Sequence, residues 1–326
     1  MALLALAALD CTQRETAKQE TRAAVAVSAS ARATERVHAV TRWDTVFAVG
    51  GAADDSTLLL PRLIAAGKGA VYAYDYGDNS VKAFDDGGRL RWRFGRRGEG
   101  PGEFMNPFDI DVGPDGTIWV LDVDAGRITH LSSEGSLLGL FRPEVTVFES
   151  LVPGNERVTI MSVSLDPFWM TVDLEGKTLA QGSAPIRKLS EIPPHLRQSL
   201  ASGAASGSVW AIAFVFGDPI LVYDGAEVRC RGWLVEGADF PPRQPDGPAT
   251  VWAAALATTD SSVFVLARGE TDKRLQLIDV YSAFDCSYQY TYVLPRRVMA
   301  MAFADGVFYF EFEDPMPVII GLRPAS

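Results

Sequence analysis

A four-strand unit that recurs along the chain constrains the fold more than any other feature of the sequence. In each copy, short runs with a two-residue hydrophobic period are separated by turn segments rich in Gly, Asp, Asn and Ser, a pattern typical of antiparallel β-meanders. The first copy comprises Arg62–Ala66, Val71–Asp75, Val81–Asp85 and Arg89–Phe94. The second comprises Pro107–Val112, Ile118–Asp122, Ile128–Leu131 and Leu137–Phe141. Repeated units of this kind predict an all-β protein in which each small sheet buries its faces against its neighbours.

Four weaker copies follow the first two. They are marked by Val158–Met161 with Phe168–Gly176, Val209–Phe216 with Ile220–Gly225, Val263–Leu266 with Tyr281–Asp285, and Val307–Phe310 with Val318–Ile320. Equivalent third-strand positions lie 41 to 61 residues apart at Phe84, Leu131, Val172, Tyr223 and Phe284. This interval is the spacing of propeller blades, with insertions in the later copies.

The two ends of the repeat array complement each other. The sixth copy lacks a fourth strand, whereas Thr41–Gly50 reads like an outer strand without a blade of its own. Pairing this segment with Val318–Ile320 would close the ring and remove two exposed sheet edges. We therefore expect residues 37–326 to form a six-bladed β-propeller with four-stranded antiparallel blades, closed by an N-terminal strand.

The junction Gly95–Phe104, followed by Pro107–Val112 and Pro114–Asp122, resembles the NHL repeat of bacterial six-bladed propellers. The resemblance covers residues 62–141, and beyond them the strand rhythm alone continues. Glycines in the junction permit backbone angles that side chains forbid, so the chain can turn sharply from one blade into the next. We expect Phe104 to pack between the blades, and the aspartates that end the second strands, Asp75 and Asp122, to cap nearby turns.

The first 36 residues predict export and tethering rather than part of the ring. Met1–Leu9 is apolar but shorter than the roughly 20 residues that span a bilayer, and it reads as the end of a truncated secretory signal within residues 1–11. Leu6–Cys11 resembles a lipobox, which implies lipidation of Cys11, although Asp10 and Ala8 depart from that pattern; the alternative is an ordinary apolar N-terminus. Residues 12–36 lack large apolar side chains and predict a disordered tether. We expect a periplasmic or outer-envelope protein, held to the membrane by a lipid if Cys11 is modified.

Composition excludes several classes of site. A net charge of −11 repels phosphate backbones, so we expect no nucleic-acid partner. The chain has three cysteines, which are too few for a disulfide framework. It also has three histidines, so a metal site with three histidine ligands would need His38 of the N-terminal tract. Cys230 falls in an outer strand and Cys286 in a turn of the next blade, so we expect no bridge between them.

No nucleophile elbow, phosphate loop, zinc motif or dehydrogenase fingerprint is present in the sequence. Asp109, Asp111 and Glu149 lie on or near inner strands and are candidate ligand-binding residues in the central channel. The inner strands of the last two blades, Val251–Ala255 and Val298–Phe303, lack carboxylates, which disfavours a channel metal site. Arg96 and Arg97 belong to a local basic cluster with two neighbouring arginines and are candidates for contacting an acidic partner.

The sequence therefore favours a monomeric, non-catalytic binding or scaffold propeller that recognises a protein, peptide or glycan without a cofactor or metal. The alternative is a metal-dependent hydrolase or lyase of small molecules, similar to gluconolactonase, with its site in the channel. A rigid ring of blades suits either function, because the fold alone does not name the ligand.

Overall fold

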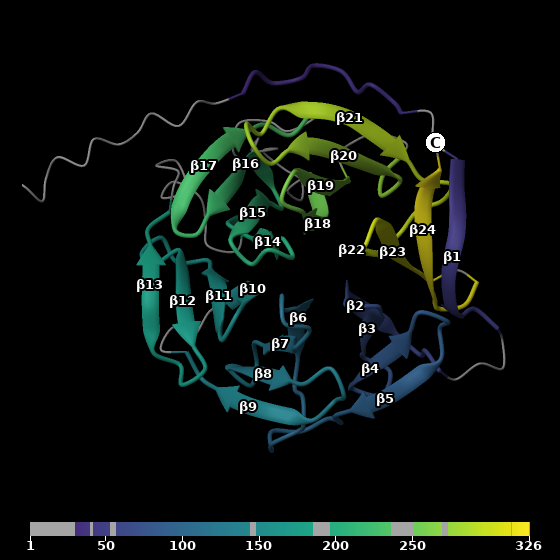
Figure 1. Ribbon diagram of the computed structural model, residues 1–326, viewed down its shortest axis with the longest axis vertical. Coiled ribbons are helices and arrows are strands. Elements are labelled where there is room, and N and C mark those ends of the chain that lie inside the picture. The colour runs from purple at the N-terminus through teal and green to yellow at the C-terminus, as the bar shows by residue number, and fades with distance from the viewer. Residues whose placement is uncertain are drawn as a thin grey trace, which may run out of the picture.

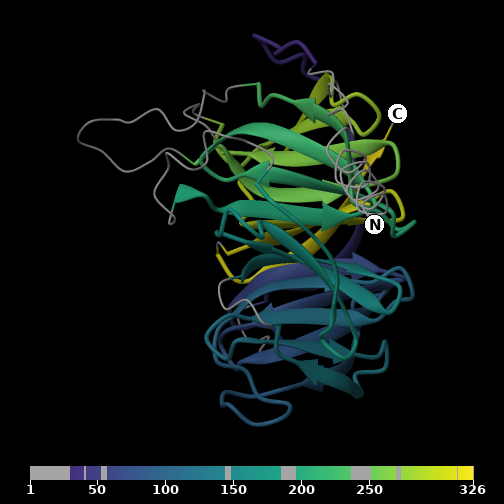
Figure 2. The ribbon, with the colours of Figure 1, turned by 90° about the vertical axis from the view of Figure 1, so that its left-hand side faces the viewer.

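The computed structural model describes residues 30–39, 42–52, 57–143, 148–184, 196–235, 251–268, 273–313 and 315–325. Within these residues, 24 strands form six antiparallel sheets of four strands each. The sheets stand around a common axis as the blades of a propeller (Figure 1), and Figure 2 shows the same ring from its side. The expected all-β, six-bladed β-propeller is thereby confirmed.

Each blade runs from an inner strand at the axis to an outer strand at the rim. Blade one contains β2 (Pro61–Gly67), β3 (Ala70–Asp75), β4 (Ser80–Asp85) and β5 (Leu90–Phe94). Blade two contains β6 (Pro107–Val112), β7 (Ile118–Asp122), β8 (Arg127–Leu131) and β9 (Leu137–Phe141). Blade three contains β10 (Phe148–Gly154), β11 (Arg157–Ser162), β12 (Trp169–Asp173) and β13 (Thr178–Gly182).

The second half of the chain repeats this arrangement. Blade four contains β14 (Ser199–Gly203), β15 (Val209–Phe214), β16 (Gly217–Asp224) and β17 (Glu227–Gly232). Blade five contains β18 (Ala253–Thr258), β19 (Ser262–Ala267), β20 (Leu277–Ser282) and β21 (Tyr288–Val293). Blade six contains β22 (Ala300–Ala304), β23 (Val307–Phe312) and β24 (Val318–Ala325), and β1 (Arg42–Gly50) is its outer strand.

The ring closes by pairing of the two ends of the propeller. Strand β1 lies antiparallel to β24, with Ala48 opposite Ile320, Val49 opposite Ile319 and Gly50 opposite Val318. The expected N-terminal closing strand is confirmed in both partner and position. Because this pairing joins segments about 270 residues apart, all six blades are held in one continuous circle.

Apolar side chains fill the interfaces between successive blades. At one equivalent position of the second strands, the side chain packs against the next blade; these residues are Tyr74, Leu121, Met161, Ala213 and Leu266. Burying each large side chain contributes about 1.5–3 kcal/mol. Blade six has Glu311 at this position, opposite Ala300 on its inner strand.

The junction between blades one and two shows why its glycine and aromatic residues are needed. Gly95 has a φ of +102°, and a Cβ at this position would lie 2.4 Å from the ring of Phe104. Phe104 is fully buried and meets Tyr74 edge-on with ring centroids 5.4 Å apart. The expected packing of Phe104 between the blades is confirmed.

Asp75 and Asp122 cap turns, as expected. Asp75 accepts hydrogen bonds from the amides of Leu59 and Leu60, both at 2.7 Å, which lie just before its own inner strand. Asp122 accepts the equivalent bonds from the amides of Met105 at 2.7 Å and Asn106 at 2.9 Å. These carboxylates therefore fix each junction to the second strand of the following blade.

Residues 30–39, called here the N-terminal strap, lie along the rim of blades four and five (Figure 1). Arg36 donates to both carboxylate oxygens of Asp279 at 2.8 Å, and Arg32 pairs with Asp218 at 2.5 Å. Both aspartates are buried, so the strap neutralises carboxylates of the ring. Of the expected tether, residues 12–36, the part up to residue 29 lies outside the described residues, as does the signal segment with Cys11.

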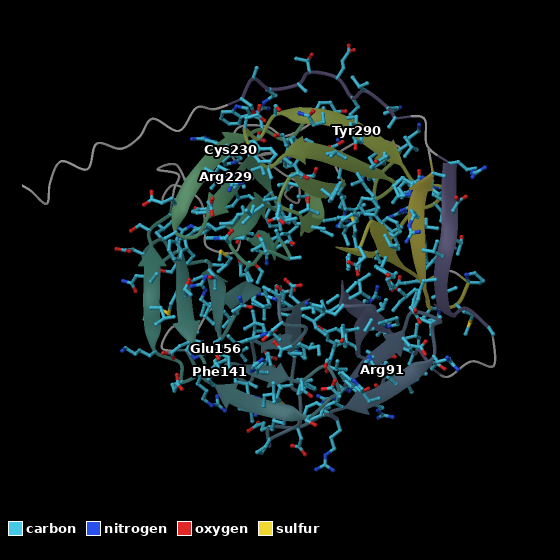
Figure 3. All side chains as sticks on the ribbon, viewed as in Figure 1. Arg91, Phe141, Glu156, Arg229, Cys230 and Tyr290 are labelled. Carbon is cyan, nitrogen blue, oxygen red and sulfur yellow. A yellow bond between two sulfur atoms is a disulfide. The ribbon has the colours of Figure 1, made fainter. Side chains whose placement is uncertain are left out.

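The expectation of unpaired cysteines is wrong. Cys230 on β17, which Figure 3 shows at the rim, forms a disulfide with Cys286 in the turn between β20 and β21, with Cα atoms 5.6 Å apart. The outer strand of blade four lies directly against this turn of blade five, because a Cβ on Gly232 would lie 2.4 Å from the Cys286 carbonyl oxygen. Positions within separate blades do not reveal such a contact, since it depends on how neighbouring blades twist past each other.

The alignment of Phe284 with the third strands is also wrong. Phe284 lies in the turn after β20 and is 65% exposed, whereas Tyr281 occupies the strand position opposite Val263. The turn spans Ser282 to Ser287, whose backbone groups pair at 2.9 Å. Apolar residues continue from the strand into this turn as Ala283 and Phe284, which hides the end of the strand in the sequence.

Candidate functional site

The inner strands of the six blades surround a cavity at the centre of the ring. Strands β2, β6, β10, β14, β18 and β22 contact one another in a closed cycle, and Figure 1 looks down between them. The cavity has a volume of about 660 Å³ and is lined by residues of all six strands. This volume lies within the range of small-molecule sites, roughly 300–1,000 Å³.

The wall of the cavity differs in polarity from side to side. Asp109 and Asp111 on β6 and Glu149 on β10 give blades two and three an acidic wall. On the side of blades five and six, the wall consists mainly of small or apolar residues, Ala254, Ala255, Ala257, Met299, Ala300 and Met301. The site therefore offers charge on one side and apolar surface on the other.

The two aspartates break the repeat of the inner strands. The register against the second strands places Asp109 and Asp111 at the positions of Leu63 and Ala65 in blade one. The same two positions hold Ser150 and Val152, Leu200 and Ser202, Ala255 and Ala257, and Ala300 and Ala302 in the other blades. Residues that differ from a structural repeat without a structural reason are expected at functional positions.

Backbone amides orient these carboxylates without neutralising them. Asp109 Oδ2 accepts from the Leu151 amide at 2.8 Å, and Glu149 Oε2 accepts from the Ser199 amide at 3.1 Å, each across to the next inner strand. Asp111 Oδ1 accepts from the Val112 amide at 2.8 Å. The second oxygens of Asp111 and Glu149 have no partner among the described residues, so they remain able to bind a ligand.

Burial shifts the titration of all three groups in the same direction. Burial raises the pKa of Asp111 to about 7 and that of Glu149 also to about 7, in each case against one hydrogen bond from a backbone amide. Burial, with the nearby charge of Asp111, raises the pKa of Asp109 well above its usual range. A group that supplies positive charge within a few ångströms would favour the ionised carboxylates.

Apolar side chains flank the cavity at the end where the inner strands begin. Phe108 is 46% exposed and Met299 is 42% exposed, and both line the cavity. Arg62 lies at the same end and is paired with Glu313, which leaves the acidic wall without that counter-ion. Exposed apolar residues at the rim of a cavity mark a surface that a ligand can cover.

Lys68, Asp260 and Asp305 line the cavity near its opposite end. They follow the ends of β2, β18 and β22, and all three are exposed. The acidic wall extends towards this end, since Asp111 is the last residue but one of β6.

The structure brings together three of the predicted binding residues, namely Asp109, Asp111 and Glu149. Arg96 and Arg97 lie in the junction after β5, are exposed, and do not line the cavity. Arg96 is paired with Glu103 at 2.7 Å within the same junction. The sequence does not single out Phe108 and Met299 as site residues. Each is a large apolar residue near the start of an inner strand, and this pattern is the same for a residue of the core.

Three hydroxyl groups near the cavity also lack partners. Ser150, Ser199 and Thr258 line it and are buried, and their hydroxyls have no hydrogen-bond partner among the described residues. An unpaired buried polar group costs roughly 1–3 kcal/mol, which a ligand or water that completes its bonds would recover. In the parts of the chain that the structure describes, no group of three or more His, Cys, Asp or Glu residues is placed to hold a metal ion.

Solved structures share the fold at low sequence identity. A protein of Bacteroides fragilis NCTC 9343 described as exported is 12% identical, with a TM-score of 0.62 over 88% of this chain and 95% of that chain. A member of the DUF4221 family from Bacteroides vulgatus ATCC 8482 is 11% identical, with a TM-score of 0.56 over 88% and 99%. A streptogramin B lyase is 13% identical, with a TM-score of 0.51 over 87% and 98%. These likenesses show the propeller fold and nothing more specific.

No protein-family model matches the chain. No curated protein matches it either. None of the described residues forms a helix long and apolar enough to cross a bilayer.

Proposed function

We propose that the protein is a non-catalytic binding protein of the cell envelope that takes its ligand into the central cavity. The observation that carries this proposal is the cavity of about 660 Å³, bounded by the inner strands of every blade and flanked by exposed Phe108 and Met299. The ligand classes that the sequence favours are proteins, peptides and glycans. A cavity of this size admits one side chain of a peptide or protein, one sugar unit, or a free small molecule.

An extracytoplasmic location is supported by the disulfide bond between two blades of the propeller. The disulfide between Cys230 and Cys286 is of a kind that persists in oxidising compartments and is rare in the cytosol. The apolar N-terminus and the likeness in fold to a protein described as exported agree with this location. Lipid anchoring at Cys11 belongs to the same proposal, and incorporation of labelled fatty acid by the wild type but not by Cys11→Ser would support it.

A metal-dependent hydrolase or lyase is the alternative function, and no observation favours it over ligand binding. Such a site needs several oxygen ligands converging on one ion. Asp109, Asp111 and Glu149 are the acidic residues of the inner strands at this wall, and the described residues contain no group arranged to hold a metal.

A thermal-shift screen tests the proposal. The wild type is screened against defined sets of amines, carboxylates, sugars and short peptides, and each ligand that stabilises it is tested again on two variants with a filled cavity. Ala255→Phe and Ser202→Trp each place a large ring in the cavity from different walls. Leu179→Trp on the outer strand β13, where Leu179 is 53% exposed, is the matched control.

We expect ligands that raise the melting temperature of the wild type and of Leu179→Trp but not of either filled variant. If no ligand class stabilises the wild type, or if every ligand binds the filled variants equally well, the cavity is not the binding site. Turnover of a bound ligand, followed by mass spectrometry, would overturn the non-catalytic assignment.

A further inference from the structure

We infer that the central cavity binds an organic cation, with its ammonium or guanidinium group at the acidic wall that Asp109, Asp111 and Glu149 form and its apolar part against blades five and six. This inference rests on the proposed function and specifies the ligand chemistry of the same site. The cation can belong to a free small molecule or to a lysine or arginine side chain of a peptide.

The placement of the carboxylates carries the first step. Two of them occupy inner-strand positions that hold Leu, Val, Ala or Ser in the other five blades, so the repeat itself does not require a carboxylate there. Each is oriented by a backbone amide, and the second oxygens of Asp111 and Glu149 have no partner among the described residues. Oriented carboxylates with free oxygens in a secluded site bind ammonium and guanidinium groups through charge-assisted hydrogen bonds.

The opposite wall of the cavity carries the second step. The alanine and methionine residues of blades five and six would cover the apolar part of a cation, which a hydrated metal ion does not possess.

The charges around the cavity decide against an anionic ligand. Arg62 is paired with Glu313, and Lys68 is exposed and follows the end of β2. Among the described residues, no basic side chain forms an ion pair with Asp109, Asp111 or Glu149, so an anion would meet three carboxylates at this wall. A cation instead supplies the charge that lets these buried carboxylates ionise.

Calorimetric titration at pH 8 tests the inference with matched probes. Phenethylamine is compared with 2-phenylethanol, its neutral analogue, and with phenylacetate, an anion of similar shape. The peptide source is tested with acetyl-Gly-Lys-Gly-amide against the same peptide carrying norleucine. We expect at least one of the two cationic probes to bind at least tenfold more tightly than its neutral analogue, and phenylacetate not to bind.

The variants separate charge from structure. In Asp111→Asn with Glu149→Gln, each residue keeps an oxygen that can accept its present amide hydrogen bond, so we expect the ring to fold and the preference for the cation to fall below threefold. Asp260→Asn with Asp305→Asn removes two exposed charges near the other end of the cavity and should retain the preference. If Asp111→Asn with Glu149→Gln fails to fold, Glu149→Gln alone should still weaken the cation at least threefold.

The outcomes distinguish this inference from the proposed function. A neutral or anionic probe that binds the wild type, and is lost in Ala255→Phe, would overturn the cation inference and leave the binding cavity in place. Cationic probes that bind Ala255→Phe and Ser202→Trp as well as the wild type would overturn both. Equal affinity of the cation and its neutral analogue for the wild type would overturn the cation inference alone.

Discussion

Replacing Glu311 by Gln should stabilise the protein at neutral pH and remove part of its pH dependence. Glu311 is fully buried on β23, and neither of its carboxylate oxygens has a hydrogen-bond partner among the described residues. In the other blades this position is held by Tyr74, Leu121, Met161, Ala213 or Leu266. Burial, with the charge of Glu313 and against that of Arg62, raises the pKa of Glu311 to about 8.

The magnitude follows from the difference in proton binding between the folded and unfolded chain. Between the unfolded pKa of 4.5 and the folded value of about 8, the folded protein keeps a proton that the unfolded chain has lost. The free energy of unfolding therefore falls as pH rises through this window, by about 1.4 kcal/mol per pH unit. The penalty is absent below pH 4.5, is about 3 kcal/mol at pH 7, and reaches its maximum above pH 8.

Denaturant unfolding at pH 5, 6 and 7 measures this effect. The stability of Glu311→Gln relative to wild type should rise by about 2.5 kcal/mol between pH 5 and pH 7, because the amide does not titrate. The unpaired amide of Gln adds a cost that is independent of pH and cancels in this difference. Glu175→Gln, at an exposed residue, is the control and should follow the wild type at every pH. If Glu311→Gln also follows the wild type, Glu311 ionises freely in the folded protein and the reasoning fails.

Two further predictions concern the rim of blades four and five. Arg36→Ala should lower the free energy of unfolding by about 3–5 kcal/mol, because it leaves Asp279 buried without this partner; Arg42→Ala, at a pair exposed on both sides, should cost less than about 1 kcal/mol in the same denaturation assay. Cys286→Ser should cost about 4 kcal/mol, the value for a cross-link between residues 56 positions apart. Its melting temperature should match that of the reduced wild type, and equal melting of reduced and oxidised wild type would exclude the Cys230–Cys286 bridge.

The sequence predicts the ring well because strand rhythm and turn residues are local signals. The pairing of β1 with β24 follows from counting strands, since a missing outer strand at one end matched a surplus strand at the other. The caps made by Asp75 and Asp122 follow from their place at the ends of second strands. Asp109, Asp111 and Glu149 could be named because their place on inner strands, near the axis, was readable from the repeat.

What could not be predicted depends on how neighbouring blades are set against each other. The contact of β17 with the turn that holds Cys286 is a property of two adjacent sheets and leaves no trace in either segment alone. The same holds for the strap, whose Arg36 meets Asp279 across 243 positions of sequence. The composition of residues 12–36 predicts a disordered tether over the whole segment. Ion pairs with distant residues, such as Arg36 with Asp279, cannot be recognised from local hydrophobicity.

A crystal structure of the protein with bound phenethylamine would show whether the ring centre is the ligand site. We expect the ammonium nitrogen about 2.7–2.9 Å from a carboxylate oxygen of Asp109, Asp111 or Glu149, and the phenyl ring against Met299, Met301 or the alanines of blade five. A ligand seated on the rim or on the strap, with the cavity holding only water, would contradict the assignment of the cavity as the binding site.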